Sequence, residues 1–303
     1  MSIRRTTLAL CGALLLAATG CGSNELSGGS TPSSEAPTST APTTAGSSGP
    51  DLSAALPAKI KAAGKIVVGT DSTYPPNEFL QGGKTVVGMD VDIFNAVAAK
   101  FGVTVEYKPA LFDTIITGVQ GGKYDIGVSS FTINAKRKQQ VNMVSYFKAG
   151  TQWATPKGNP KGVDPNNACG KTVAVQKGTT QLEDDLPVKQ KACKDAGKPE
   201  INLVIREKQD QANADVATGK ADAMLADSPI VLYAAKQSNG QIEPLGQIYD
   251  AAPYGYVIPK AETQFAAAIV EALKATAADG SYKAALAKWG NESGAISTFA
   301  VNP

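Results

Sequence analysis

Short apolar runs alternate along the chain with longer stretches in which apolar residues recur at the spacing of one helix face. Residues 65–70, KIVVGT, are typical of a strand, and residues 90–101, with apolar side chains every three or four positions, are typical of a helix. Strands are predicted at residues 65–70, 103–107, 125–128, 172–176, 201–205 and 223–225. Helices are predicted at residues 90–101, 112–119, 179–191, 209–218 and 229–236, with two further helical runs between residues 262 and 289. This alternation indicates an α/β fold in two halves, with mainly parallel sheets covered by helices.

The start of the chain has a different pattern. Arg4 and Arg5 precede an apolar run at residues 8–18, and the small residues Ala-Thr-Gly then stand directly before Cys21. A short apolar run behind a basic start predicts an export signal over residues 1–20. The segment resembles a bacterial lipoprotein signal, in which Cys21 would be diacylated and become the mature N-terminus. Ordinary secretion without a lipid is the alternative.

The composition of residues 21–50 predicts a tether. Beyond Cys21 this segment consists mainly of Ser, Thr, Gly, Pro and Ala, and Leu26 is its only large apolar residue. It cannot bury enough apolar surface to offset the entropy lost on ordering, so we expect a disordered coil with a reach of about 30 Å. A lipid on Cys21 would then hold a folded domain close to the outer face of the cell membrane.

Composition excludes several classes of function. The chain has 303 residues and no His, which rules out every triad, general base and metal site that depends on His. Of the 29 basic residues two lie in the signal, and the other 27 balance the 27 acidic residues. A neutral domain has no general attraction for nucleic acid, so we expect no nucleic-acid partner.

Cys169 and Cys193 remain once Cys11 leaves with the signal and Cys21 carries lipid. An isolated pair in an exported chain predicts a disulfide, which would stabilise the fold by roughly 3 kcal/mol for a loop of this length. Metal ligation and a redox pair are the alternatives, and both would need closer spacing or further ligands.

Polar segments follow four of the predicted strands, where ligands bind in parallel sheets. They are DSTYPP after residue 70, SSFTIN and then Arg137 after residue 128, KGTTQ after residue 176, and Asp227-Ser228 after residue 225. Arg137 is one of two arginines beyond the signal, and its planar fork could hold a carboxylate. Asp227 could accept hydrogen bonds from an ammonium. Recognition of a small zwitterion is therefore one interpretation; a solvated helix face for Arg137 and a helix N-cap for Asp227 are the plainer ones.

Hydroxyl and aromatic side chains extend this hypothesis. Ser130, Thr132 and the backbone amides of residues 179–181 could donate to a carboxylate, and Tyr74 and Phe112 could cover an aliphatic stem or a cation. The plainer interpretations are an ordinary loop, a capped helix and core packing.

Taken in order, these segments resemble the family 3 extracytoplasmic solute-binding proteins, the amino-acid-binding components of ABC importers. The resemblance runs from about residue 64 to residue 289, and its most specific part is GMDVDI at residues 88–93. Five further blocks stand in the family's order, namely GTDSTYPP, FDTIITGVQGGKYDI, SSFTINAKRKQQV, VAVQKGTTQ and ADGSYKAALAKWG. The resemblance implies a periplasmic-binding-protein type II fold, with two lobes joined by a hinge of two strands. Lobe 1 would comprise residues 51–150 plus 251–303, and lobe 2 residues 151–250.

The resemblance also implies which side chains meet the ligand in the cleft between the lobes. They are Asp71, Tyr74, Phe112, Ser129, Ser130, Thr132 and Arg137 from lobe 1, and Thr180, Gln181 and Asp227 from lobe 2. Arg137 would take the α-carboxylate with Thr132 and the region of Thr180, while Asp227 and Ser130 would take the α-ammonium. The ligand's side chain would be surrounded by Asp71, Tyr74, Phe112 and Gln181. Asn77, Met89 and Lys136 depart from the family's usual pattern.

The implied function is binding and not catalysis. We expect a monomeric lipoprotein that captures a polar amino acid by closing its lobes and delivers it to an ABC permease, with no cofactor and no metal. An acidic ligand would need a second cation in the cleft, which disfavours Glu and Asp. A ligand-sensing module for a membrane receptor and a cyclohexadienyl-dehydratase-like lyase on the same fold are the alternatives.

Overall fold

The computed structural model describes residues 52–303, so the predicted signal peptide, Cys21 and the tether lie outside the described residues. The strands are β1 (Lys65–Thr70), β2 (Thr73–Tyr74), β3 (Glu78–Gln81), β4 (Thr85–Val87), β5 (Thr104–Pro109), β6 (Ile126–Gly127), β7 (Asn142–Pro156), β8 (Thr172–Gln176), β9 (Asn202–Arg206), β10 (Ala223–Asp227) and β11 (Ile242–Ile258). The α-helices are α1 (Ala58–Ala63), α2 (Met89–Lys100), α3 (Phe112–Gln120), α4 (Ala135–Gln140), α5 (Leu186–Asp195), α6 (Gln209–Ala217), α7 (Ser228–Gln237), α8 (Thr263–Ala278) and α9 (Ser281–Trp289). Short turns of other helix types are η1 (Leu52–Ala55), η2 (Gln181–Asp185) and η3 (Glu292–Gly294).

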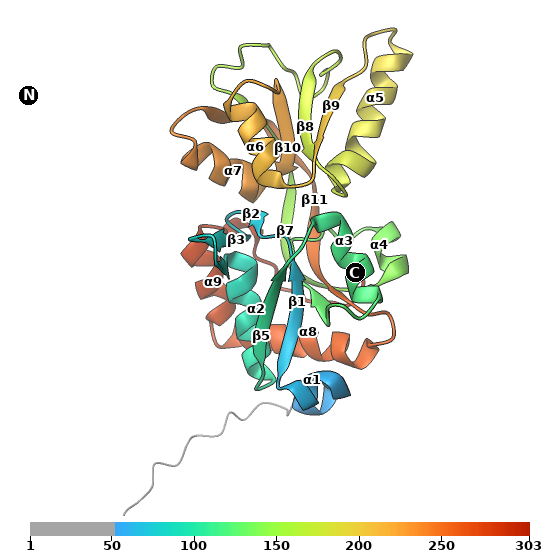
Figure 1. Ribbon diagram of the computed structural model, residues 1–303, viewed down its shortest axis with the longest axis vertical. Coiled ribbons are helices and arrows are strands. Elements are labelled where there is room, and N and C mark those ends of the chain that lie inside the picture. The colour runs from blue at the N-terminus through green and yellow to red at the C-terminus, as the bar shows by residue number, and fades with distance from the viewer. Residues whose placement is uncertain (1–51) are drawn as a thin grey trace, which may run out of the picture. The chain divides into compact units, whose positions relative to one another are not determined.

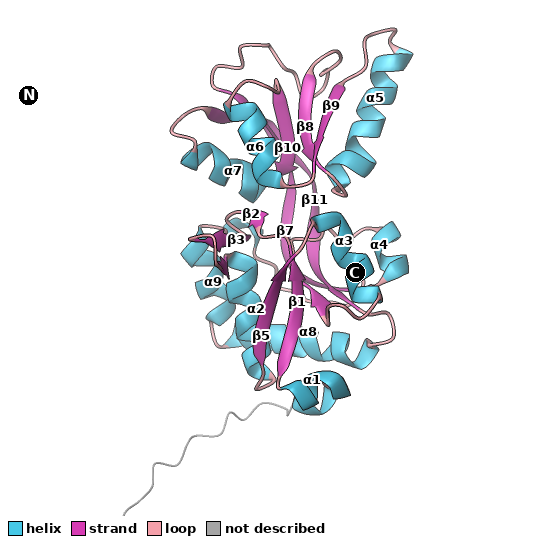
Figure 2. Ribbon diagram, in the orientation of Figure 1, coloured by secondary structure: helices cyan, strands magenta, loops and turns pink. Residues whose placement is uncertain are grey.

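One sheet of eight strands runs through both halves, in the order β5-β1-β6-β11-β7-β10-β8-β9. β1 pairs in parallel with β5 and β6 at one end, and β8 pairs in parallel with β9 and β10 at the other. We call the half with β1, β5 and β6 lobe 1, and the half with β8, β9 and β10 lobe 2. The long strands β7 and β11 pair antiparallel and run from one lobe into the other (Figure 1). Helices flank the strands of each lobe (Figure 2). The predicted two-lobed α/β fold with a two-strand hinge is therefore confirmed.

The buried apolar side chains form separate clusters in the two lobes. In lobe 1 Phe94 and Ile269 belong to one such cluster, and in lobe 2 Val173 and Leu186 belong to another. Tyr74 is an exception, because it follows β1 in lobe 1 but packs into an apolar cluster of lobe 2. Since each lobe has its own core, the lobes can move as bodies about the two connecting strands.

Several predicted elements form where the pattern placed them, and others differ. β8 has the predicted bounds, and α2 is shifted by one residue. The helix expected at residues 179–191 instead starts as a π-helix over Gln181–Asp185, which continues into α5. β11 had no strand pattern, because Pro244, Gly246 and Pro253 are residues that interrupt strands. Its pairing with β7 shifts register in the same region, which accommodates them.

Gly88 fixes the start of α2. Its φ is 140°, and a Cβ at this position would lie 2.1 Å from the carbonyl oxygen of Asn77, so only glycine fits. The backbone N–H of Asp90 donates to that same oxygen at 2.9 Å. The glycine therefore lets α2 start against the segment that follows Tyr74, and Asp90 is held close to the polar residues described below.

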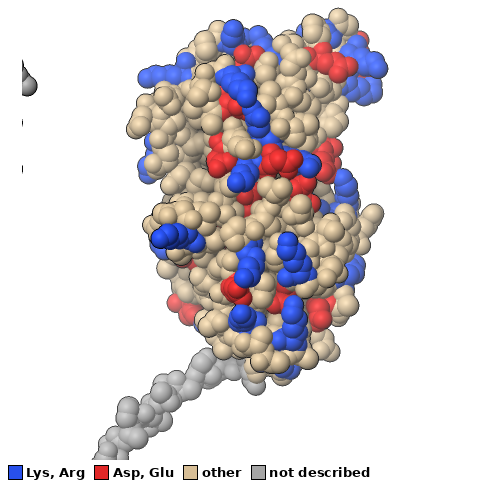
Figure 3. Space-filling view, viewed as in Figure 1, with Lys and Arg blue, Asp and Glu red and all other residues tan. Residues whose placement is uncertain are grey.

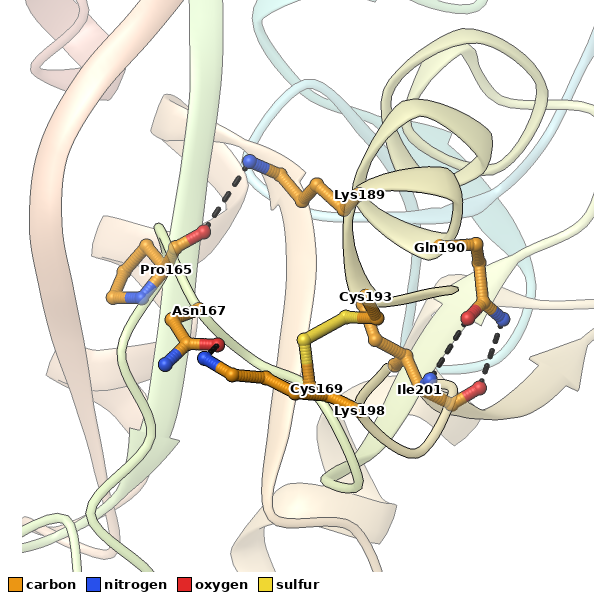
Figure 4. Close-up of a disulfide and its surroundings, with 8 residues drawn as sticks. All are labelled: Pro165, Asn167, Cys169, Lys189, Gln190, Cys193, Lys198 and Ile201. Carbon is orange, nitrogen blue, oxygen red and sulfur yellow. Dashed lines mark hydrogen bonds between the residues drawn. A yellow bond between two sulfur atoms is a disulfide. The ribbon is translucent and has the colours of Figure 1, made fainter. Parts of the chain in front are cut away.

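A disulfide joins Cys169 and Cys193 in lobe 2, with their Cα atoms 5.5 Å apart, which confirms the predicted pairing. It ties the loop before β8 to α5 (Figure 4). Beside it the side-chain amide of Gln190 bonds both backbone groups of Ile201, accepting from the N–H at 2.8 Å and donating to the carbonyl at 2.9 Å. The end of α5 is thus held at two points.

Candidate ligand-binding cleft

A cavity lies between the ends of strands from both lobes. It is lined by Asp71, Tyr74, Phe112, Ser130, Thr132 and Arg137 of lobe 1 and by Gln176, Thr179, Thr180, Gln181 and Asp227 of lobe 2. Nine of the ten predicted site residues are in this lining, and Ser129 is not.

Arg137 is held in lobe 1 by α4, whose N-cap Asn134 bonds its backbone N–H, and is only 7% exposed. Its Nη1 donates to the carbonyl oxygen of Thr132 at 2.8 Å, and its Nη2 donates to that of Gly178 in lobe 2 at 2.9 Å. The guanidinium also lies over the ring of Phe112, at 5.4 Å from its centroid. Burial lowers the pKa of Arg137, but a guanidinium stays charged.

This buried cation forms no ion pair with any acidic residue within 52–303, so the solvated-face interpretation is wrong. A buried charge is costly unless it is paired, and Arg137 is suited to hold a carboxylate that enters the cavity. The other arginine beyond the signal is differently placed. Arg206 is paired with Asp215, with Nε–Oδ2 2.5 Å and Nη2–Oδ1 2.9 Å, and does not line the cavity.

Asp227 ends β10 and occupies the N-cap position of α7, yet its side chain makes no capping bond. Its carboxylate instead accepts from the Tyr74 hydroxyl at 3.0 Å, the Tyr254 hydroxyl at 2.7 Å and Nε2 of Gln181 at 2.8 Å. The N-cap interpretation is therefore wrong for the side chain. Burial raises the pKa of Asp227. All three donors are neutral, and the charge of Arg137 acts on this carboxylate only through space, so the carboxylate could receive an ammonium.

Asp71 is the second acidic side chain of the lining and directly follows β1. Its Oδ1 accepts from the backbone N–H of Thr73 at 3.1 Å and from the Thr73 hydroxyl at 2.8 Å. Its Oδ2 accepts from Nε2 of Gln176 at 2.5 Å, and Gln176 is the last residue of β8 in lobe 2. The side chain is buried, and burial raises the pKa of Asp71. This carboxylate, too, has only neutral partners.

Ser129 and Ser130 connect the cavity to two buried carboxyl groups behind it. The Ser129 hydroxyl accepts from the Asp71 backbone N–H at 2.9 Å and donates to Glu78 at 3.0 Å, so it supports the lining from behind. Ser130, with φ 49°, donates its N–H and hydroxyl to Asp90 at 2.9 and 3.1 Å. Burial raises the pKa of both Glu78 and Asp90. The Ser130 hydroxyl oxygen also accepts from Nδ2 of Asn77 at 2.9 Å, so buried polar groups behind the cavity fix the position of this hydroxyl.

Hydrogen bonds cross from lobe 1 to lobe 2 around the cavity. They join Tyr74 and Tyr254 to Asp227, Arg137 to Gly178, Asp71 to Gln176, and Thr73 to the backbone N–H of Gln209. The backbones also approach closely at Gly178, where φ is 76° and a Cβ would lie 2.8 Å from Cβ of Asp113. The lobes therefore meet in direct contact on both sides of the cavity.

Sequence reasoning missed some residues of this site. Gln176 and Thr179 line the cavity, and both stand at the end of the strand predicted at residues 172–176, so the strand-end rule could have included them. Tyr254 bonds Asp227 from β11, whose strand pattern was absent from the sequence. No local sequence pattern pointed to Glu78, whose carboxyl group accepts from the Ser129 hydroxyl at 3.0 Å in the folded chain.

Residues 52–303 contain no group of three or more His, Cys, Asp or Glu placed to hold a metal ion. Nor does this part of the chain contain a helix with the length and apolar character needed to cross a membrane.

The sequence can be compared with known families now that the cleft is described. Residues 66–292 match the sequence model of the bacterial extracellular solute-binding proteins, family 3. The chain belongs to this family. The family predicted from the sequence motifs is thereby confirmed, and the matched residues include every side chain that lines the cavity.

This family 3 solute-binding protein has relatives in sequence and in structure. It is similar to the arginine-binding protein ArgT of Corynebacterium glutamicum, at 34% identity over 253 residues, which cover 84% of this chain and 83% of ArgT. A solved structure of an ancestral arginine-binding protein bound to arginine has 33% identity and a TM-score of 0.68, covering 75% of this chain and 98% of the other. The ancestral amino acid-binding protein AncCDT-1, a precursor of cyclohexadienyl dehydratase, has 31% identity and a TM-score of 0.67, covering 76% of this chain and 97% of the other.

Proposed function

We propose that this protein captures an L-amino acid with a cationic side chain, L-arginine foremost, between its lobes and delivers it to the permease of an ABC importer. The observation that carries the proposal is the buried guanidinium of Arg137, which borders the cavity without a carboxylate partner among residues 52–303. The α-carboxylate of an amino acid is the group that this guanidinium lacks. A bidentate pair of this kind is among the stronger polar interactions in proteins.

The rest of the lining fits the other groups of an amino acid. The hydroxyls of Thr132 and Thr180 border the cavity and could share the carboxylate with Arg137. Asp227 could accept the α-ammonium, because its present donors are neutral and a charge-assisted bond is stronger. Ser130, which borders the cavity, is the second proposed contact of the same ammonium.

Charge balance selects the class of ligand side chain. The lining holds one cation, Arg137, and two acids, Asp71 and Asp227. The two ends of a zwitterion would neutralise Arg137 and Asp227, which leaves the buried carboxylate of Asp71 for a guanidinium or an ammonium on the ligand. The similarity to ArgT and to the arginine-bound ancestral protein supports arginine. An acidic side chain would meet Asp71 and no second cation.

Closure would follow from where these groups lie. Arg137 and Asp71 belong to lobe 1 and Asp227 to lobe 2, so a ligand that touches all three binds the closed arrangement better than the open one. The ligand thus supplies the free energy that holds the lobes together. A permease could distinguish loaded from unloaded protein by this difference in lobe arrangement.

We also propose roles for the N-terminal segments and boundaries for the two lobes. We infer a lipoprotein with its signal at residues 1–20 and a lipid on Cys21. A tether over residues 21–50 would hold a monomer at the outer face of the cell membrane. Lobe 1 would comprise residues 51–150 plus 251–303, and lobe 2 residues 151–250. We infer binding and not catalysis, and incubation with prephenate or arogenate, assayed for product, would reveal a lyase.

The experiment is a panel of L-amino acids tested by calorimetry and thermal unfolding on the wild-type protein. L-Arginine at about a hundredfold excess over its Kd should add about 2.7 kcal/mol to the free energy of unfolding. Arg137→Ala should lose this shift, and Arg137→Lys, which keeps the charge without the fork, should retain part of it. Arg206→Ala is the matched control, because Arg206 lies outside the cavity, and it should bind like wild type. Full affinity in Arg137→Ala would contradict the carboxylate site.

A further inference from the structure

Three further polar contacts join the lobes outside the cavity lining, near Arg137 and Gly178. They are Lys136 to Glu183 at 2.5 Å, Lys177 to Asp113 at 3.0 Å, and Asn134 to Asp184 at 3.3 Å. In each contact one partner belongs to α3 or the start of α4 in lobe 1, and the other to the loop after β8 or to η2 in lobe 2. Figure 3 shows acidic and basic side chains gathered at the level where the lobes meet.

These contacts surround the most direct polar link between the lobes. Lys136 immediately precedes Arg137, and Lys177 immediately precedes Gly178, whose carbonyl accepts from Arg137 at 2.9 Å. The side chains of Lys136 and Glu183 are 65% and 40% exposed, so neither is in contact with the enclosed cavity. Hydrogen bonding to Glu183 raises the pKa of Lys136, as expected for a partner held close.

We propose that the Lys136–Glu183 and Lys177–Asp113 pairs form an electrostatic latch that favours closure of the lobes and so sets ligand affinity without touching the ligand. An exposed ion pair contributes little to folding when both partners stay side by side in every state. Here the partners belong to different lobes, so each pair forms on closure and separates on opening. Lys177 also keeps a partner in its own lobe, Glu207 at 3.3 Å, so the Lys136–Glu183 pair depends more fully on closure. Its contribution enters the open–closed equilibrium, and apparent affinity scales with the closed fraction.

The first test measures the affinity for L-arginine and therefore rests on the proposed function. Lys136→Gln should weaken this affinity by about twofold to fivefold, the range for one exposed pair, mainly through faster dissociation. Lys136→Glu should weaken it further, and the exchange Lys136→Glu/Glu183→Lys should restore it. The sign is diagnostic, because an extra negative charge near the cleft would by itself attract a cationic ligand and tighten binding.

The matched control is Lys191→Glu, which breaks a 2.6 Å ion pair with Asp195 inside α5 and should leave affinity unchanged. Unchanged or tighter binding by Lys136→Glu, or an exchange variant that fails to recover, would overturn the latch. If wild type binds no L-arginine, the ligand assignment fails on its own. The latch is then judged by X-ray scattering of the free proteins, where Lys136→Glu should have a larger radius of gyration than wild type at low salt, and an equal radius would overturn it.

Discussion

Asp71→Asn is the substitution that tests how the cleft would select a cationic side chain. Asparagine has nearly the same shape, and its Oδ1 can still accept from the Thr73 N–H and hydroxyl, as Asp71 does at 3.1 and 2.8 Å. Its other terminal atom becomes an amide nitrogen in place of the oxygen that now accepts from Gln176 at 2.5 Å. The change therefore removes one buried negative charge from the lining together with the bond from Gln176, and it leaves the loop's turn intact.

The magnitude follows from burial, since Asp71 is only 2% exposed. Removing one partner of a buried charged hydrogen bond costs about 2–4 kcal/mol in binding, which is about 30-fold to 1,000-fold in Kd for L-arginine. L-Citrulline has the same length but a neutral terminus, so its affinity should change by less than about fivefold. The preference of wild type for arginine over citrulline should collapse in Asp71→Asn.

Calorimetry with both ligands on both proteins measures this change, together with thermal unfolding of the ligand-free forms. Asp210→Asn is the control, because Asp210 is exposed and lies outside the cavity lining but contributes to the electrostatic surroundings of Asp71. It should retain the preference for arginine. An arginine-to-citrulline ratio in Asp71→Asn equal to that of wild type would refute the reasoning, because Asp71 would then not meet the ligand's cation.

Two other predictions concern acid and the disulfide. Burial raises the pKa of Asp71 and of Asp227, so acidification protonates both before ordinary carboxyls of pKa about 4. The affinity for L-arginine should therefore fall as the pH drops below neutral, and calorimetry at a series of pH values measures this change. An affinity that rises on acidification would contradict the roles of both carboxylates. Replacing Cys169 and Cys193 with Ala should lower the free energy of unfolding by roughly 3 kcal/mol for a loop closed over 24 positions. Denaturant titration measures this change, and an unchanged free energy of unfolding would show that the crosslink does not stabilise lobe 2. The affinity for L-arginine should stay near that of wild type, since neither Cys lines the cavity.

The sequence was sufficient for the elements whose pattern is local. β8 was predicted with its observed bounds because the strand-forming residues TVAVQ are followed, after Lys177, by glycine and two hydroxyl residues. The strand-end rule then brought Asp71, Thr180 and Asp227 together, because the carboxyl ends of strands in the two lobes face the same cavity. Nine of ten predicted residues line the cavity for this reason and because the motif order matched a known family.

What the sequence did not indicate depends on contacts between distant segments. For Asp227 the sequence left both a helix N-cap and a ligand contact open, and the hydrogen bonds from Tyr74 and Tyr254 exclude the side-chain cap. β11 carries Pro and Gly at positions that a regular strand excludes, and its long pairing with β7 outweighs this local preference. Ser129 seemed a ligand contact, but its hydroxyl is engaged by Glu78 and by the Asp71 backbone.

Calorimetric titration of the wild-type protein with L-arginine and with agmatine tests whether Arg137 holds the α-carboxylate of a cationic amino acid in this cleft. Agmatine has the same guanidinium side chain but no carboxylate. We expect saturable binding of L-arginine and binding of agmatine that is weaker by about 100-fold or more, since the buried guanidinium of Arg137 would be left unpaired. Equal affinity for the two compounds would contradict the carboxylate site, and no binding of L-arginine would contradict the proposed ligand.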